Sequence, residues 1–306
     1  MRMKIKEKYK IIKLEEKDYP EKLKKIKKVP KVLYALGNIE LLNDSCFAIV
    51  GTRKISDYGK ENCEKISKEF AFRDIPVVSG MAIGTDAVAH KTVLKYGGKT
   101  IAVLGSGFNH IYPKENTELF YEILENDGLI ITEYEKNVEP YKRNFPARNR
   151  IITAISEGVL VIEAAYRSGT SITANNAKDQ GKKVFALPGK LDSYLGIGVN
   201  KLIKEGAILT TNINDIIEHY PQFMNKKRKT SIKKLNKVDR KYLKIYKLIE
   251  KEGKFLEDLI ENSGLRYKEV ITLLMEMELK NLIYRQISGK YVMKKQEECE
   301  WKKKKL

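Results

Sequence analysis

The chain has 306 residues, of which 59 are Lys or Arg and 40 are Asp or Glu, so its formal net charge is +19. No apolar run approaches the roughly 18 residues that a membrane-spanning helix needs, and the basic first residues lack the apolar stretch of a secretory signal. The three cysteines show no CxxC spacing, which fits free thiols in a reducing compartment, so we expect a cytoplasmic protein.

The positive charge is concentrated outside the middle of the chain. Residues 1–31 hold 13 basic and 5 acidic side chains, and residues 222–241 hold 9 and 1. Residues 32–221 are close to neutral, with 22 basic and 23 acidic side chains. A charge of +19 suggests a nucleic-acid partner, but in such a lysine-rich chain the placement of the scarcer arginines is more informative.

Residues 45–219 are expected to form an α/β domain with an extended, Rossmann-like, mostly parallel sheet that has helices on both faces. Short apolar runs alternate there with helical stretches, as parallel sheets require. Residues 1–44 read as a basic N-terminal lead-in, which is weakly structured over 1–31 and could form one short strand at 32–36. The strands expected in the domain are 46–50, 76–79, 100–104, 129–132, 159–163, 184–187 and 207–209.

The remaining chain predicts a basic linker over 220–238, a small domain over 239–293 and a basic tail over 294–306. The small domain shows apolar residues at helical spacing, a helix–turn–helix pattern and a hairpin, which together suggest a winged helix. Its candidate recognition helix, 266–280, carries as many acidic as basic side chains, so we favour an auxiliary or protein-binding role over duplex reading.

Several expected strands end in loops rich in Gly, Ser or Thr. In parallel sheets ligands bind beyond the carboxyl ends of the strands, and loops that lead into helices leave N–H donors for an anion. We therefore expect a site for a phosphate-bearing ligand at this edge, although each glycine could also serve only to close a tight turn. The loops in question are GTRK (51–54), SGMAIGTD (79–86), GSGFNH (105–110), EAAYRSGTS (163–171) and PGK (188–190).

The segment 142–156 carries three closely spaced arginines. At helical spacing, Arg148 is in line with the isoleucines that follow it, whereas Arg150 points nearly opposite and is expected to be a solvated charge. A buried arginine requires a partner, which would be Asp86, Glu133, Glu163 or an anionic ligand.

Two other features of this region have competing interpretations. Phe145 could stack on a base, as in single-strand binders, or act as a hydrophobic staple on its own helix. Asp86 and His90, four residues apart, could be an acid/base pair or half of a metal site, but a structural hydrogen bond between them is favoured. The three histidines are too scattered to predict a metal site, and no cofactor is expected.

A series of motifs along most of the chain resembles the DprA/Smf family of DNA-processing proteins. The resemblance implies a Rossmann-like protein without enzymatic activity that binds single-stranded DNA, forms a homodimer and helps to load the RecA recombinase during natural transformation. The motifs are YPEKLKKI (19–26), VGTRKISDYG (50–59), SGMAIGTDAVAH (79–90), TIAVLGSGFNHIYPKEN (100–116), FPARNRII (145–152), VIEAAYRSGTSITA (161–174) and VFALPGK (184–190).

The resemblance also implies candidate DNA-contacting residues. These are Arg53, Phe145, Arg148 and Arg150, with Ser168, Gly169, Thr170 and Lys183 nearby. From the same loops and the same arginine-rich segment we add Gly51, Thr52, Gly80, Arg143 and Asn149. Two alternatives stay open: a phosphoribohydrolase-like enzyme acting on nucleotides, and a ligand-sensing transcription regulator that uses the winged helix.

Overall fold

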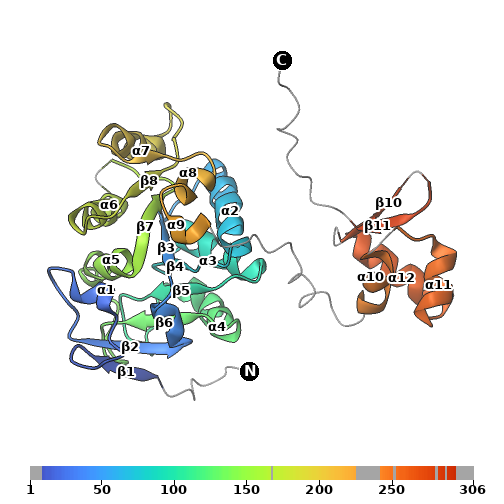
Figure 1. Cartoon of the computed structure of the whole chain (residues 1–306), viewed down its shortest axis with the longest axis horizontal. Helices are drawn as coiled ribbons and strands as arrows, with labels where there is room; N and C mark the ends of the chain where they lie inside the picture. Colours follow the sequence, from blue (N-terminus) through green and yellow to red (C-terminus); the bar gives the residue numbers. More distant parts are fainter. Residues whose placement is uncertain are drawn as a thin grey trace. The chain divides into compact units, whose positions relative to one another are not determined.

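The computed structural model of the chain describes residues 9–166, 168–224, 242–250, 253–279, 282–286 and 288–293 (Figure 1). The chain divides into two compact units, Met1–Ser231 and Ile232–Leu306. None of the helices within the described ranges is long and apolar enough to cross a membrane.

The first unit is built on a sheet whose nine described strands run in the order β1-β2-β6-β5-β4-β3-β7-β8-β9. All neighbours from β6 to β9 are parallel, whereas β2 is antiparallel to both β6 and β1. The strands are β1 (Lys10–Lys13), β2 (Val32–Gly37), β3 (Cys46–Val50), β4 (Val77–Ser79), β5 (Thr100–Val103), β6 (Leu129–Thr132), β7 (Ser156–Val161), β8 (Val184–Ala186) and β9 (Ile208–Leu209).

Helices cover both faces of this sheet, which confirms the predicted fold class (Figure 1). One face carries α1 (Glu21–Lys24), α5 (Asn144–Ile155), α6 (Gly169–Asp179) and α7 (Tyr194–Lys204). The other face carries α2 (Asp57–Phe72), α3 (Thr85–Lys95), α4 (Thr117–Glu125), α8 (Asn214–Ile217) and α9 (Pro221–Met224). Two short 3-10 turns, η1 (Ile39–Leu42) and η2 (Lys114–Asn116), complete the connections.

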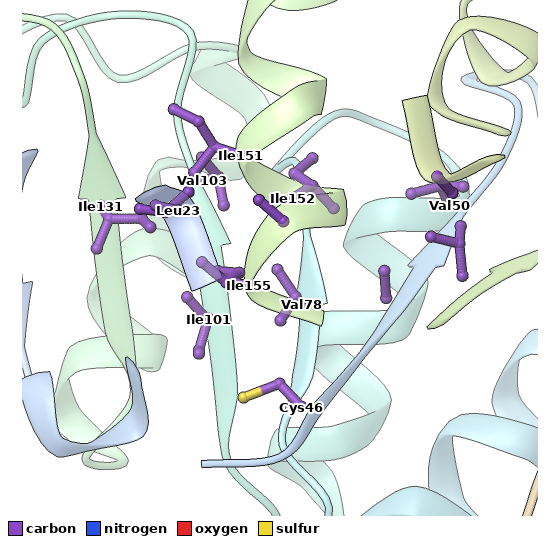
Figure 2. Packing of buried hydrophobic residues seen from close by; sticks show 14 of the residues in the cluster. Leu23, Cys46, Val50, Val78, Ile101, Val103, Ile131, Ile151, Ile152 and Ile155 are labelled. Atoms are coloured by element: carbon purple, nitrogen blue, oxygen red, sulfur yellow. The ribbon is translucent and has the colours of Figure 1, made fainter. Parts of the chain in front are cut away.

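The isoleucines of α5 fix this helix on the sheet. Ile151, Ile152 and Ile155 are at most 1% exposed and point at strand side chains such as Val78 and Ile101 (Figure 2). Burying each such side chain contributes roughly 1.5–3 kcal/mol. The position of α5 over the carboxyl ends of the strands is therefore well defined, and so are the positions of the residues at the start of this helix.

The N-terminal boundary that we predicted is wrong. The short strand predicted at 32–36 is present as β2, but it belongs to the sheet of the domain, and β1 lies beyond it within the stretch that we expected to be weakly structured. Strand β1 was missed since only Ile12 of its four residues is buried and lysines stand at both ends. An edge strand of this kind has no alternating apolar signal.

The predicted linker also begins too early. Tyr220 and Phe223 belong to the core of the first unit, where both rings pack on Phe47. The unit therefore continues at least to Met224, and the polar composition after residue 221 concealed this last helix. The rest of the predicted linker and the predicted tail 294–306 lie outside the described residues.

The second unit has its own apolar core. Its described residues form α10 (Leu243–Glu250), α11 (Leu256–Ser263) and α12 (Tyr267–Leu279), followed by the antiparallel pair β10 (Ile283–Arg285) and β11 (Tyr291–Met293). Gly264 ends α11 with a φ of 64°, a left-handed cap that glycine adopts without strain. This order of elements is the one the sequence pattern predicts, and the winged-helix assignment stays a prediction.

Candidate functional site

The strand order places a topological switch beside β3. The chain runs from β3 through β4 and β5 to β6 on one side, and then returns to β7 on the other side of β3. In open parallel sheets the crevice at the carboxyl ends of such strands is the usual ligand site. The loops after β3, β4, β5 and β6 all reach this edge, so the site can be built from them.

The first helix N-terminus at this edge is occupied by a side chain of the protein. The carboxylate of Glu163, just after β7, accepts hydrogen bonds from the backbone N–H of Ser56 at 2.9 Å and from its hydroxyl at 2.5 Å. Ser56 caps α2 and is itself bonded to the N–H of Gly59. A negative charge at a helix N-terminus is stabilising, and here the protein supplies it internally.

The loop after β4 is arranged in the same way. One oxygen of Asp86, which is buried, accepts the N–H groups of Gly80 at 3.1 Å and Ala82 at 3.3 Å. The expectation that these loops bind an anion through their backbone amides is thus not met at either position.

The glycines of these loops allow close packing between loops. A Cβ on Gly51 would stand 2.4 Å from the Thr85 hydroxyl oxygen, and one on Gly84 would stand 2.5 Å from the carbonyl oxygen of Thr52. Gly84 also has a φ of 79°, in the region that glycine favours. Gly51 and Thr52 are therefore part of the scaffold that presents the neighbouring Arg53 to solvent.

Arg148 is buried, with 4% of its surface exposed, as its alignment with the isoleucines predicted. Its Nη1 donates to the carbonyl oxygens of Gly80, at 2.6 Å, and Val103, and its Nε donates to the Asn149 amide oxygen at 3.2 Å. The hydrogen-bond partners at the strand ends are thus main-chain carbonyls, and within the described part of the chain Nη2 makes no hydrogen bond. The side chain ties α5 to the carboxyl ends of β4 and β5.

The charge of Arg148 is balanced in part by Asp86. Burial lowers the pKa of Arg148 to about 10, the nearby carboxylate of Asp86 opposes this shift, and the positive charge of Arg53 adds to it. The guanidinium and the carboxylate both lie close to Gly80, since a Cβ there would stand 2.7 Å from Arg148 Nη2 and 2.8 Å from Asp86 Oδ2. Two arginines against one carboxylate leave this corner of the edge positive.

The predicted hydrogen bond between Asp86 and His90 is wrong. The His90 Nδ1 atom lies 2.6 Å from the hydroxyl oxygen of Thr100, whose own proton goes to the Val77 carbonyl, so Nδ1 is the donor. Nε2 is buried without a partner. Burial, with the positive charge of Arg148, lowers the pKa of His90 to about 3 and keeps the ring neutral. His90 thus serves the packing of α3 on β5, and among the described residues no group of acidic, His or Cys side chains could hold a metal.

A small open pocket lies at the carboxyl ends of β3 to β6. The Arg53 guanidinium stands 5.5 Å from the centroid of the Phe145 ring, and Tyr112 stands 5.3 Å from it on a tilted plane. Phe145 packs on these two residues and on Gly105. It is the second residue of α5, whereas a hydrophobic staple uses the residue before the N-cap, so Phe145 is not a staple. The lining residues are Arg53, Gly80, Ala82, Ile83, Tyr112, Pro113, Phe145 and Arg148.

The rest of the arginine-rich segment is spread over the surface of α5. Arg150 is not the solvated charge that we expected: both its terminal nitrogens bond to the Glu133 carboxylate at 2.6 Å, and Nε donates to the Lys28 carbonyl. Neither partner lies on α5, so the spacing of residues along this helix could not predict them. Arg143 is exposed just before α5, and its guanidinium carbon lies 5.6 Å from the centroid of the Tyr141 ring. The side-chain oxygen of Asn149 accepts a hydrogen bond from Arg148.

The structure separates the remaining candidates from the pocket. Ser168, Gly169 and Thr170 begin α6, on the β7 side of the switch and not among the pocket residues. Lys183 directly precedes β8 and pairs with His219 at 3.0 Å, which places it at the amino ends of the strands. Its predicted position near the site is wrong, because Lys183 precedes β8, whereas the loop at the site edge follows the carboxyl end of that strand.

Tyr112, Pro113 and Ile83 are pocket residues that the sequence analysis did not single out. Their signal was present, since the GSGFNH loop and the Ile-Tyr-Pro that follows it lead away from the carboxyl end of β5. An aromatic residue in a loop at a predicted ligand edge is a candidate contact, and 42% of Tyr112 is exposed.

Comparison with known proteins gives a consistent match over the first unit. Residues 10–221 match the family described as DNA recombination-mediator protein A. The protein Smf of Escherichia coli (strain K12) is 42% identical over 201 residues, which is 66% of this chain and 54% of that protein. The DNA processing protein DprA of Streptococcus pneumoniae is 41% identical over 202 residues, which is 66% of this chain and 71% of that protein.

Two solved structures share the fold. The X-ray structure of DNA processing protein A from Streptococcus pneumoniae superposes with a TM-score of 0.66 at 39% identity, covering 69% of this chain and 74% of that one. A structure of DNA processing protein A from Helicobacter pylori, which describes its single-stranded DNA binding mode, superposes with a TM-score of 0.64 at 33% identity. The match covers 72% of this chain and 99% of that one. The second unit lies outside the residues that the family match covers.

Proposed function

This chain belongs to the DNA recombination-mediator protein A family, a family of DNA-binding mediators rather than enzymes, and from this premise we propose that it binds single-stranded DNA through the pocket at the carboxyl edge of its sheet. The observation that carries the proposal is the meeting of Arg53 with the aromatic side chains of Tyr112 and Phe145 at one pocket. A single strand offers such a pocket both phosphates and unstacked bases. We propose that Arg53 neutralises a phosphate and that the aromatic side chains accept a base.

The pocket suits a single strand better than a duplex. In B-form DNA the faces of the bases are stacked on one another, and only their edges reach the grooves. An aromatic side chain stacks on a base whose face is free, and in a single strand no base pair has to be broken to free that face. Residues 32–221, which supply the whole pocket lining, are close to neutral, and this agrees with a few placed arginines rather than a broad basic surface.

A nucleotide-processing enzyme is the weaker alternative. Rossmann-like enzymes hold a nucleotide phosphate at the N-terminus of the first crossover helix. Here the Glu163 carboxylate occupies that position on α2 through two hydrogen bonds to Ser56. A phosphate placed there would face a carboxylate, which disfavours this chemistry.

The finer parts of the proposal extend to the whole protein. We propose a cytoplasmic homodimer that protects incoming single-stranded DNA and helps the RecA recombinase to assemble on it during natural transformation. The second unit is proposed to be a winged helix with an auxiliary or protein-binding role. These parts rest on the family and the sequence pattern, and this chain spans about half the length of the Escherichia coli relative.

Fluorescence anisotropy tests the DNA-binding proposal. An oligo-dT strand, its duplex with oligo-dA and free nucleoside monophosphates are compared on the full chain. If about five phosphates are neutralised, the slope of log affinity against log salt is about −3.5, or roughly a 100-fold loss between 50 and 200 mM salt. Preference for the duplex, or turnover of a nucleotide, contradicts the proposal.

A further inference from the structure

A turn rich in lysine follows α1, on the face of the sheet that carries α5 (Figure 1). Residues 25–31, named here the lysine turn, hold four lysines and no acidic side chain. The two lysines before the turn are neutralised, since Lys22 pairs with Glu157 and Lys24 with Glu21. The lysines of the turn are all exposed, and none of them forms an ion pair with a described residue: Lys25, Lys27, Lys28 and Lys31.

The backbone of the lysine turn is held in place from its inner side. Ile26 and Pro30 are buried there, and the hydroxyl of Tyr19 donates to the Pro30 carbonyl at 2.6 Å. From α5, Arg150 Nε donates to the Lys28 carbonyl at 2.8 Å. Because the backbone is fixed before any ligand arrives, only the lysine side chains lose freedom when an anion binds.

The lysine turn leads to the carboxyl edge of the sheet. After Lys31 the chain enters β2, which is antiparallel to β6 and pairs Tyr34 with Thr132 at the end of that strand. Arg150, which holds the turn, is itself bound to Glu133 just after β6. Since β6 lies between β5 and β2 in the sheet, the turn ends at the same edge as the pocket, on the side away from β7.

The composition of this surface fits a phosphate backbone better than a protein partner. The apolar residues of the turn are buried or half-buried, so no exposed apolar side chain is present to form the centre of a protein interface. Lysine acts on a phosphate as a point charge without a required orientation. The loop after β6 adds no excess of negative charge, because residues 134–143 hold three basic and two acidic side chains.

We propose that the lysine turn binds the phosphate backbone of the DNA strand where the strand leaves the pocket. This inference rests on the proposed function of the pocket. The ligand of the turn is a run of phosphodiesters, bound without regard to the bases. These contacts are separate from the contact at Arg53, and only a strand that extends beyond the pocket can make them.

One variant combines Lys27→Gln, Lys28→Gln and Lys31→Gln, and anisotropy titrations compare it with the wild type on oligo-dT strands of increasing length. The shortest strands that bind should show wild-type affinity. On long strands the variant should bind roughly 5-fold more weakly for each lost phosphate contact at about 100 mM salt. The log–log salt slope for these strands should become shallower by up to about 2, which is about 0.7 for each of three phosphates.

A matched control removes three exposed lysines from α2 and α3, on the other face of the sheet, through Lys60→Gln, Lys91→Gln and Lys95→Gln. It lowers the net charge equally and should keep wild-type affinity and slope at every length. Both variants should keep the wild-type Tm, because all the replaced side chains are exposed.

Lysine acetylation read by mass spectrometry tests the unsubstituted protein. A long oligo-dT strand should protect Lys27, Lys28 and Lys31 from acetylation, a short strand should not, and Lys60 should stay reactive with both.

Three outcomes overturn the inference: equal affinity loss at all lengths, no loss at any length, or the same loss in the control. If Arg53→Ala weakens binding of short and long strands while the lysine variant changes neither, only this inference fails. If Arg53→Ala leaves short strands bound as in the wild type, the proposed function of the pocket fails as well.

Discussion

Arg148 is predicted to stabilise the fold rather than to contact a phosphate. Arg148→Ala removes the donor to the carbonyls of Gly80 and Val103 and leaves the buried Asp86 without its counter-charge. Each buried acceptor left without a donor costs about 1–3 kcal/mol, and breaking a buried charge pair costs about 3–5 kcal/mol. Since these terms overlap, we expect a total loss of about 3–5 kcal/mol.

Differential scanning calorimetry of the full chain measures this loss. For a unit of this size about 1 kcal/mol corresponds to 2–4 °C, so Tm is expected to fall by roughly 6–20 °C. Lys183→Ala, which removes an exposed charge at the other edge, should leave Tm nearly unchanged. The remaining folded Arg148→Ala protein should keep the wild-type salt slope for DNA. A Tm within about 2 °C of wild type, together with a shallower slope, would refute the structural role.

Three other substitutions test neighbouring parts of the account. The pKa of His90 is about 3 in the folded protein and 6.5 in the unfolded chain, so the contribution of His90 to the free energy of unfolding should be constant above pH 6.5 and fall by about 1.4 kcal/mol per pH unit below it. His90→Asn should make this decline less steep in urea titrations, and an unchanged decline contradicts the assignment. Gly105→Ala should weaken single-strand binding by pushing the Phe145 ring out of place, whereas unaltered affinity in anisotropy titrations speaks against the pocket. Glu163→Gln removes a charged acceptor from the N-terminus of α2 and should cost about 1.5–3 kcal/mol in thermal melts; a Tm equal to that of the wild type contradicts its capping role.

The sheet could be predicted from sequence wherever its strands are buried on both faces. Residues 46–50 form a continuous apolar run because both faces of β3 are covered. Lys10–Lys13 could not be predicted in this way, since an edge strand needs only one buried side chain. The helix at 221–224 was hidden because its single core residue, Phe223, stands beside a polar, basic stretch.

The site could be predicted only in part, for a physical reason. The spacing of Arg148 relative to the isoleucines required burial and a partner, and both are observed. Its hydrogen-bond acceptors could not be predicted, because main-chain carbonyls at strand ends leave no mark in the sequence. The prediction for Arg150 failed for the same reason, because its partner Glu133 is 17 residues away along the chain, just after β6. The apolar periodicity of a sequence defines the faces of a single helix but gives no information about the residues that pack against that helix.

The salt dependence of single-strand binding by Arg53→Ala tests the central claim most directly. If Arg53 neutralises one phosphate at the pocket, the substitution should weaken oligo-dT binding and make the log–log salt slope shallower by about 0.7. Lys183→Ala removes the same charge from the opposite edge and should leave both quantities unchanged. A wild-type slope in Arg53→Ala, or an equal change in Lys183→Ala, would show that the pocket is not where the DNA backbone is held.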